Sequence, residues 1–330
     1  MELNQILQGD CIKVVQSLPP DTIQTVITSP PYWGLRDYGM TEQIGLEETV
    51  QEYIQIIVSL FREIKRVLKD DGTVWLNLGD AYAGSGRGRI ANGQAHPGIN
   101  HMQSVGQTSG VINLSNKVAG LKPKDLIGLP WRVAFALQED GWYLRKDIVW
   151  NKPNAMPESV RDRPTSSHEY IFLLSKSQKY YYDNEAIKEE AAYKPFPDPP
   201  RGSKGAFGME QQGRREDKPR GSFKGKYGDL AFRAIRNKRN KRSVWTVATK
   251  PTKDAHFATY PVELIEPCVL AGCPVDGIVL DPFMGSGTTG IAALKHSRNF
   301  IGIELNPEYI KIANKRLNGV QIELIHLSHP

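Results

Sequence analysis

Residues 277–290 read Gly-Ile-Val-Leu-Asp-Pro-Phe-Met-Gly-Ser-Gly-Thr-Thr-Gly, and this stretch decides the fold of the 330-residue chain. The apolar run 277–280 predicts a buried strand, and the G-x-G-x-x-G pattern that follows predicts a tight turn into a helix. Glu304 comes nineteen residues after Gly285, at the end of the next expected strand, 299–304. An acidic side chain there can accept hydrogen bonds from both hydroxyls of a ribose. The unit therefore predicts a nucleotide site.

The glycine pattern alone fits NAD as well as it fits S-adenosylmethionine. Asp281 separates the two, because a carboxylate beside the first glycine would meet the ammonium of a methionine moiety but would repel a pyrophosphate. The free N–H groups at the start of the helix also suit an anionic group such as a carboxylate. The residues favour the methyl donor, and an NAD-dependent oxidoreductase of Rossmann type remains the alternative from another class.

A second strand and loop stand at the other end of the chain. Residues 23–29 read as a buried strand that leads into Ser29-Pro30-Pro31-Tyr32, and an amphipathic helix is expected over 47–69, ended by Asp70-Asp71-Gly72. A further strand at 73–78 completes a strand–helix–strand unit, which is typical of a parallel sheet. We therefore expect an α/β fold, with a mostly parallel twisted sheet and helices on both faces.

Further elements are expected on both sides of two irregular stretches. The sequence predicts helices near 123–140, 261–271, 287–296 and 307–317, and strands at 143–150, 168–175 and 277–281. A Gly-rich loop covers about 84–120, and residues 186–242 again lack periodicity.

The positive charge is concentrated in one segment. Residues 186–250 contain 17 Lys or Arg against 7 Asp or Glu, whereas the rest of the chain has 25 basic and 29 acidic residues. Such a distribution is expected of a polyanion-binding insertion in a near-neutral domain. Cys11, Cys268 and Cys273 lack metal-type spacing, so neither zinc nor disulfides are expected. No apolar run is long enough for a membrane span and no signal peptide is visible, so a cytoplasmic protein is expected.

The two loops together resemble the amino-methyltransferases of DNA. Ser-Pro-Pro-Tyr follows one strand and Asp-Pro-Phe-x-Gly-x-Gly follows another, and the tetrapeptide comes first in the chain. That order is similar to the circularly permuted β group, and the resemblance covers about 1–80, 121–183 and 250–317. It implies a Rossmann-like methyltransferase fold in three parts: a catalytic half at 1–183, a target-recognition insertion at 184–249, and a cofactor-binding half at 250–330.

The resemblance also implies cofactor contacts at particular positions. Asp10 precedes the first helix, where the family's aspartate commonly hydrogen-bonds the adenine amino group, and Thr259 lies in a segment like the one that wraps the methionine end. Residues 146–153 resemble the strand and loop that flank the base pocket. The cofactor-binding residues are predicted to be Asp10, Thr259, Asp281, Phe283, Gly285, Ser286, Gly287, Thr288 and Glu304.

The chemistry of an exocyclic amine explains the tetrapeptide. The lone pair of such an amine is delocalised into the ring, and acceptors placed around the NH₂ group return electron density to the nitrogen. Ser29 Oγ and the Pro30 carbonyl are suitable acceptors, since proline fixes the backbone angle that aims that carbonyl. Tyr32 can stack on a base that has been flipped out of the duplex. The predicted catalytic residues are Ser29, Pro30, Pro31 and Tyr32.

The identity of the amine depends on Ser29. In the family, Ser-Pro-Pro-Tyr usually goes with cytosine N4, and Asp- or Asn-Pro-Pro-Tyr with adenine N6. The sequence thus predicts a site-specific, S-adenosylmethionine-dependent DNA cytosine-N4 methyltransferase; the alternatives are an adenine-N6 enzyme and a non-catalytic DNA-binding module. No cysteine stands in this loop, so the covalent route to carbon 5 of cytosine is not expected.

Double-stranded DNA is the expected partner, and two kinds of residue are predicted to contact it. Some continue the tetrapeptide loop, and others are the basic clusters of the insertion. These residues are Trp33, Arg36, Arg214, Arg215, Arg236, Lys238, Arg239, Lys241 and Arg242. A cognate restriction endonuclease is a candidate partner, and a monomer or a homodimer is expected.

Overall fold

The computed structural model describes residues 1–35, 39–40, 43–83, 120–190, 238–250 and 260–328. Five predicted site residues lie outside the described residues: Arg36, Arg214, Arg215, Arg236 and Thr259. So does nearly all of the expected Gly-rich loop at 84–120. The chain divides into two compact units, Met1–Asp183 with Arg242–Pro330, and Asn184–Lys241.

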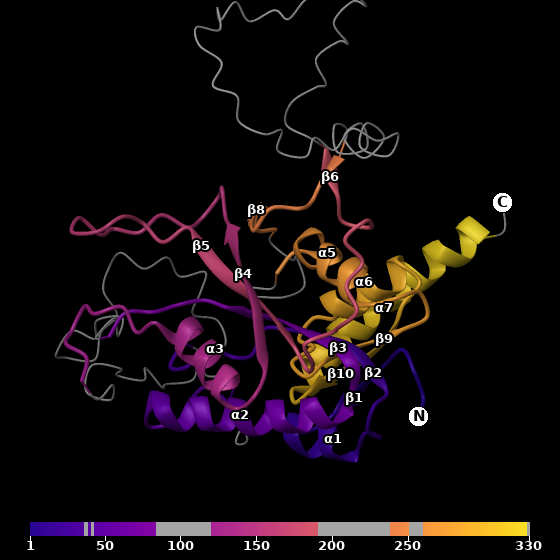
Figure 1. Ribbon diagram of the computed structural model, residues 1–330, viewed down its shortest axis with the longest axis horizontal. Coiled ribbons are helices and arrows are strands. Elements are labelled where there is room, and N and C mark those ends of the chain that lie inside the picture. The colour runs from indigo at the N-terminus through magenta and orange to yellow at the C-terminus, as the bar shows by residue number, and fades with distance from the viewer. Residues whose placement is uncertain (36–38, 41–42, 84–119, 191–237, 251–259, 329–330) are drawn as a thin grey trace, which may run out of the picture. The chain divides into compact units, whose positions relative to one another are not determined.

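The larger unit is built on a mixed sheet, which has eight strands among the described residues (Figure 1). Their order across the sheet is β1-β10-β9-β2-β3-β5-β4-β8. The strands from β1 to β3 in that order run parallel, β5 is antiparallel to both of its neighbours, and β8 is parallel to β4. Their bounds are β1 (Gln5–Gln8), β2 (Ile23–Thr28), β3 (Leu68–Leu78), β4 (Tyr143–Asn151), β5 (His168–Ser175), β8 (Val244–Thr246), β9 (Ile278–Asp281) and β10 (Asn299–Glu304).

Helices cover both faces of the sheet, as expected. α1 (Cys11–Ser17), α2 (Val50–Val67) and α3 (Leu129–Glu139) pack side by side on one face. α5 (Val262–Gly272), α6 (Thr288–Lys295) and α7 (Pro307–Ser328) pack on the other (Figure 1). The predicted fold class, a mostly parallel Rossmann-like sheet between two helical layers, is confirmed.

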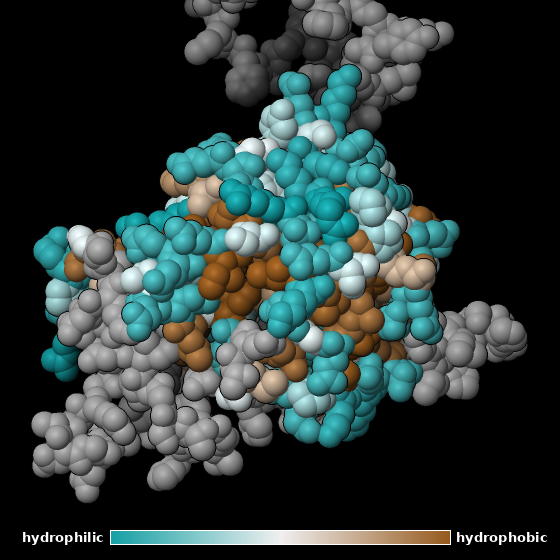
Figure 2. Space-filling view, turned by 90° about the horizontal axis from the view of Figure 1, so that it is seen from below, coloured by the Kyte–Doolittle hydropathy of each residue, from teal (hydrophilic) through white to brown (hydrophobic). Residues whose placement is uncertain are grey.

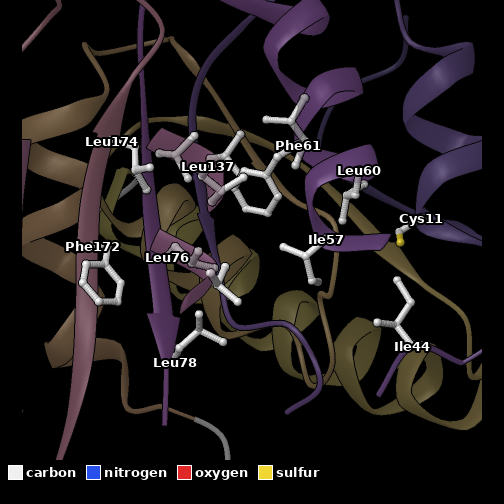
Figure 3. Close-up of a cluster of buried hydrophobic side chains, with 14 of the residues drawn as sticks. Cys11, Ile44, Ile57, Leu60, Phe61, Leu76, Leu78, Leu137, Phe172 and Leu174 are labelled. Atoms are coloured by element: carbon white, nitrogen blue, oxygen red, sulfur yellow. The ribbon is translucent and has the colours of Figure 1, made fainter. Parts of the chain in front are cut away.

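Local sequence explains the start and the orientation of α2. Thr49 and Glu52 form a capping box, in which each side chain accepts a hydrogen bond from the other residue's backbone N–H. The buried side of the helix packs on β3, and its apolar side chains belong to a cluster that also takes in residues of β5 (Figure 3). This cluster includes Ile57, Leu60, Phe61, Leu76, Leu78, Phe172 and Leu174. Seen from below in Figure 1, the surface is mostly hydrophilic around a band of hydrophobic side chains (Figure 2).

Several elements differ from the expectation. Residues 70–72 were expected to end the helix before a strand at 73–78, but β3 begins at Leu68 and takes them in, with a register irregularity against β2. α3 begins at Leu129 rather than near 123, because Gly128 adopts a left-handed conformation (φ 71°) and Pro130 follows in the first turn. α7 continues to Ser328, well beyond 317. The short strands β1 and β8 were not expected.

The smaller unit contains one described strand pair. β6 (Glu189–Glu190) and β7 (Lys238–Arg239) run antiparallel, and Arg239 Nε donates to Glu189 Oε1 at 2.8 Å.

In the parts of the chain that the structure describes, no helix is long and apolar enough to cross a membrane. Cys11, Cys268 and Cys273 are all buried, as expected of core residues.

Candidate active site

The sheet order brings the two predicted loops together. β9 and β2 are parallel neighbours, with Val26 opposite Leu280, so their carboxyl ends meet at the same edge of the sheet. β9 leads into the glycine turn and α6 on one face, whereas β2 leads through the tetrapeptide to α2 on the other. In an open α/β sheet, ligands bind outside the carboxyl ends of the strands where the strand order reverses in this way. The fold therefore predicts the site at these two loops.

Asp281 connects the two loops directly. Its side chain is 1% exposed, and Oδ1 accepts hydrogen bonds from Thr28 Oγ1 (2.7 Å) and Phe283 N (3.0 Å). Its other oxygen accepts from Thr289 Oγ1 (2.6 Å) and from Tyr260 OH (3.1 Å). Burial raises the pKa of Asp281, and these donors oppose that rise. The carboxylate is thus fully engaged within the chain, and its contact with a methionine ammonium stays a prediction.

The glycine turn has the shape that close approach of a ligand requires. Gly285 (φ 51°) and Gly287 (φ 85°) are left-handed, and α6 begins directly after Gly287. A Cβ atom on Gly287 would also lie 3.0 Å from Ala313 Cβ. The side chains of Ser286 and Thr288 are almost completely buried, so the turn offers its backbone rather than these hydroxyls to a ligand.

Glu304 lies beside this turn, at the end of β10. Its two carboxylate oxygens accept from Gly285 N and Asn306 N, both at 2.8 Å. Burial raises the pKa of Glu304, and the two N–H donors oppose the rise. Each oxygen of a carboxylate can accept a further bond, so both ribose hydroxyls could be bound here. The turn and Glu304 together fit the ribose and methionine parts of S-adenosylmethionine.

Asp10 reaches the same edge of the sheet. β1 pairs with β10 so that Gln8 is opposite Glu304, and Gly9 N donates to the Glu304 carbonyl at 3.1 Å. Asp10 also caps α1, because its Oδ1 accepts from Lys13 N at 2.9 Å. The structure thus places Asp10 beside Glu304, while its contact with the cofactor adenine stays a prediction.

Arg316 is a residue of this region that the sequence prediction missed. It reaches from α7 to the glycine turn, where it donates to Ser286 Oγ at 2.6 Å and to the Ser286 carbonyl. No motif surrounds it in the sequence, and only the packing of α7 against α6 brings it here.

The carbonyl groups of the tetrapeptide differ in their partners. Tyr53 OH donates to the Pro31 carbonyl at 2.9 Å, and Leu35 N donates to the Tyr32 carbonyl at 3.2 Å. The Pro30 carbonyl, by contrast, accepts no hydrogen bond from any described residue. The Pro30 carbonyl, which is the predicted acceptor for the amine, is therefore left available by the described part of the chain.

The side chains of Ser29 and Tyr32 belong to one hydrogen-bonded group. Tyr32 OH donates to Glu169 Oε2 at 2.8 Å and lies 3.4 Å from Ser29 Oγ. Burial, and then the nearby Glu169 charge, hold the pKa of Tyr32 well above its usual value. Its hydroxyl thus stays protonated and donates. Glu169 in turn pairs with Lys152, which follows β4 in the segment expected to flank the base pocket.

Trp33 corrects one prediction. It was expected to contact DNA, but its side chain is 1% exposed and its indole N–H donates to the Glu47 carbonyl at 3.0 Å. Trp33 is therefore a core residue, because its ring is buried and its indole N–H is hydrogen-bonded within the fold.

Four of the predicted basic DNA contacts are described. Lys238 and Arg239 lie on β7, and Lys241 and Arg242 follow it. Arg239 is paired with Glu189, so part of its charge is compensated within the chain. Among the described residues, no group of His, Cys, Asp or Glu side chains is arranged to hold a metal ion.

The fold and the paired loops define a protein with the Rossmann-like methyltransferase fold. Residues 23–315 match the DNA methylase family, and the chain belongs to it, as a DNA methyltransferase of the N6 and N4 group.

Similar proteins include the Type II methyltransferase M.Cfr9I of Citrobacter freundii, which is 47% identical over 99% of this chain and 93% of its own length. M.SmaI of Serratia marcescens is 47% identical over 95% of this chain and 90% of its own.

Two solved structures share the fold. The PvuII DNA methyltransferase (cytosine-N4-specific) has a TM-score of 0.59 at 18% identity and covers 96% of this chain and 90% of its own. A putative DNA modification methylase from Thermus thermophilus, complexed with S-adenosyl-L-methionine, has a TM-score of 0.53 at 21% identity, over 96% and 95%. As a member of the DNA methylase family, the chain uses S-adenosylmethionine as its cofactor.

Proposed function

We propose that the protein is a site-specific DNA methyltransferase that transfers a methyl group to the exocyclic N4 of a flipped cytosine in double-stranded DNA. The observation that carries the proposal is the Pro30 carbonyl, unpaired among the described residues, which follows Ser29 next to the cofactor turn. Ser29 supplies a neutral hydroxyl where a carboxylate or amide would favour adenine N6. The name of the PvuII neighbour, cytosine-N4-specific, supports the same base.

The cofactor supplies an activated methyl group on a sulfonium. Gly285 and Gly287 would give room for its methionine part, and Glu304 and Asp10 would hold the ribose and the adenine. Because Asp281 joins the turn to Thr28, the methyl group and the tetrapeptide are held in one geometry. Positioning of this kind is the main source of acceleration for an in-line transfer.

The tetrapeptide would prepare the amine. Ser29 Oγ and the Pro30 carbonyl would accept hydrogen bonds from its two N–H groups, which would return electron density to the nitrogen and make it a better nucleophile. Tyr32 stacks on the face of the base, a contact that contributes about 1–3 kcal/mol. A base within a duplex cannot reach this loop, so the cytosine is flipped out.

The insertion at 184–249 would recognise the target sequence. Its positive charge matches the phosphate backbone, and Lys238, Lys241 and Arg242 are the described candidates for phosphate contacts. A cognate restriction endonuclease would cut the same site when it is unmethylated, and the enzyme would act as a monomer or a homodimer.

The product nucleoside tests the proposal. Purified protein is incubated with mixed-sequence duplex DNA and the radiolabelled cofactor, and the DNA is then digested to nucleosides. Label in N4-methylcytosine is the expected result. Label in N6-methyladenine would instead show that the protein methylates adenine N6. Sequencing of modified bases in DNA from expressing cells would then give the recognition site.

A further inference from the structure

The buried side of the tetrapeptide carries an ion pair that the methyl-transfer chemistry does not use. Glu169, at the start of β5, pairs with Lys152, and both side chains are less than one-fifth exposed (17% and 18%). An ion pair withdrawn from water to this extent is costly unless its remaining hydrogen-bonding capacity is used. One further partner is Tyr32, whose hydroxyl donates to the second Glu169 oxygen at 2.8 Å.

The pair is held in place from several sides. Glu169 Oε1 accepts a hydrogen bond from the Lys152 ammonium. That ammonium also lies 4.3 Å from the centre of the Trp150 ring, which is a cation–π contact. Trp150 Nε1 is itself fixed by the Val247 carbonyl at 2.8 Å. The carboxylate that Tyr32 meets is therefore part of a rigid group on β4 and β5, rather than a mobile surface side chain.

Gly79 is an independent sign that the Tyr32 ring is confined. A Cβ atom at this position would lie 2.7 Å from Tyr32 Cε2 and 3.3 Å from Glu169 Cδ, closer than ordinary contacts allow. The backbone after β3 thus closes one side of the ring, and Glu169 fixes its hydroxyl end.

We propose that Glu169, oriented by Lys152, is a positioning residue that fixes the Tyr32 ring as the platform on which the flipped base stacks. The inference rests on the proposed function, since it gives Tyr32 a base to hold. A stacked base can rotate and slide on a mobile ring, whereas its amine must stay in line with the methyl group. A displacement of about 1 Å can lower a rate by on the order of 10²-fold.

The test compares single-turnover methyl transfer in a set of variants, on a duplex that carries the methylation site mapped by sequencing. Glu169→Ala should lower the rate by roughly 10²-fold, with little change in cofactor affinity. Glu169→Gln keeps an acceptor for the Tyr32 hydroxyl and should retain more of the rate than the alanine variant. In a Tyr32→Phe background, the further change Glu169→Ala should lower the rate by less than about threefold, because the effects of two residues that act through one contact are not additive.

Two further variants keep the test informative. Glu158→Gln is the matched control, since it breaks another partly buried pair, with Arg163 at 2.6 Å, in the same β4–β5 connection; it should leave the rate unchanged. Gly79→Ala displaces the Tyr32 ring and crowds the Glu169 side chain, but it removes neither member of the ion pair, and it should lower the rate even if Glu169→Ala does not fold.

Additive losses of Tyr32→Phe and Glu169→Ala, or full activity of Gly79→Ala, would overturn the positioning role. A wild-type protein that methylates no DNA would instead overturn the proposed function itself.

Discussion

Thr28→Val tests the connection between the two loops. Thr28 and Asp281 are 253 residues apart in the chain, yet the hydroxyl donates to the carboxylate at 2.7 Å in a fully buried setting. A hydrogen bond to a charged group contributes about 1.5–3 kcal/mol, and valine keeps nearly the same shape, so this is the expected loss in free energy of unfolding. Because the other three donors still bond to the Asp281 carboxylate, the loss in free energy of unfolding should not exceed the upper end of this range.

Thr25→Val is the matched control, on the same strand. Thr25 is equally buried, but its hydroxyl meets only neutral partners, the Thr73 carbonyl (3.1 Å) and the Thr73 hydroxyl (2.9 Å). Neutral hydrogen bonds contribute about 0.5–1.5 kcal/mol, so this variant should lose about half as much stability. Only Thr28→Val should also lower methyl transfer, by about tenfold if 1.4 kcal/mol of positioning is lost.

The assay is urea unfolding followed by tryptophan fluorescence, at several pH values. The Thr28 hydroxyl lowers the pKa of Asp281 while burial raises it, so the bond matters most when the carboxylate is ionised. The extra loss in Thr28→Val should therefore shrink as the pH falls and Asp281 becomes protonated. Equal losses in the two variants, or a loss that does not change with pH, would refute the reasoning.

Three other outcomes are expected. Ser29→Ala should reduce turnover far more than cofactor affinity, measured by single-turnover rates and calorimetric titration; equal losses in both would contradict its role. Replacing the basic residues of 238–242 by Gln should weaken DNA binding and flatten its dependence on salt, and an unchanged slope in a filter-binding assay would place the DNA elsewhere. Burial raises the pKa of Cys11 and of Cys273 to about 12, so neither thiol should react with Ellman's reagent at pH 8 until the protein unfolds. Unfolded thiols ionise near 9.0, so the unfolding free energy should also fall as the pH rises from about 9 towards 12.

The sequence predicted the elements whose signal is local. The strand, glycine turn and helix at 277–296 are clear because a buried apolar run and glycine conformations leave little choice. The start of β3 at Leu68 was missed, since Asp70-Asp71-Gly72 has the composition of a turn and only pairing with β2 makes it a strand. Trp33 was misjudged for a similar reason: an aromatic residue beside a catalytic loop gives no sign of whether it faces the core.

The sequence predicted the motifs of the site, but it did not predict the side-chain contacts between them. Ser29 to Tyr32 and residues 281–287 stand out by their residue types and by their position after strands. Glu169, Tyr53 and Arg316 do not, because each acts through hydrogen bonds to a residue far away in the chain. Such bonds depend on sheet order and helix packing, which periodicity does not report.

The pairing of β2 with β9 also constrains how the protein is made. β2 is complete by Thr28, but its parallel neighbour begins only at Ile278, so most of the chain must leave the ribosome before the two can meet. Until then β2, all of whose residues are buried in the finished fold, has one open edge. Open edges of apolar strands promote misassembly during synthesis, and such long-range pairing forms slowly. Enzyme competent to modify DNA therefore arises only after β9 has been synthesised.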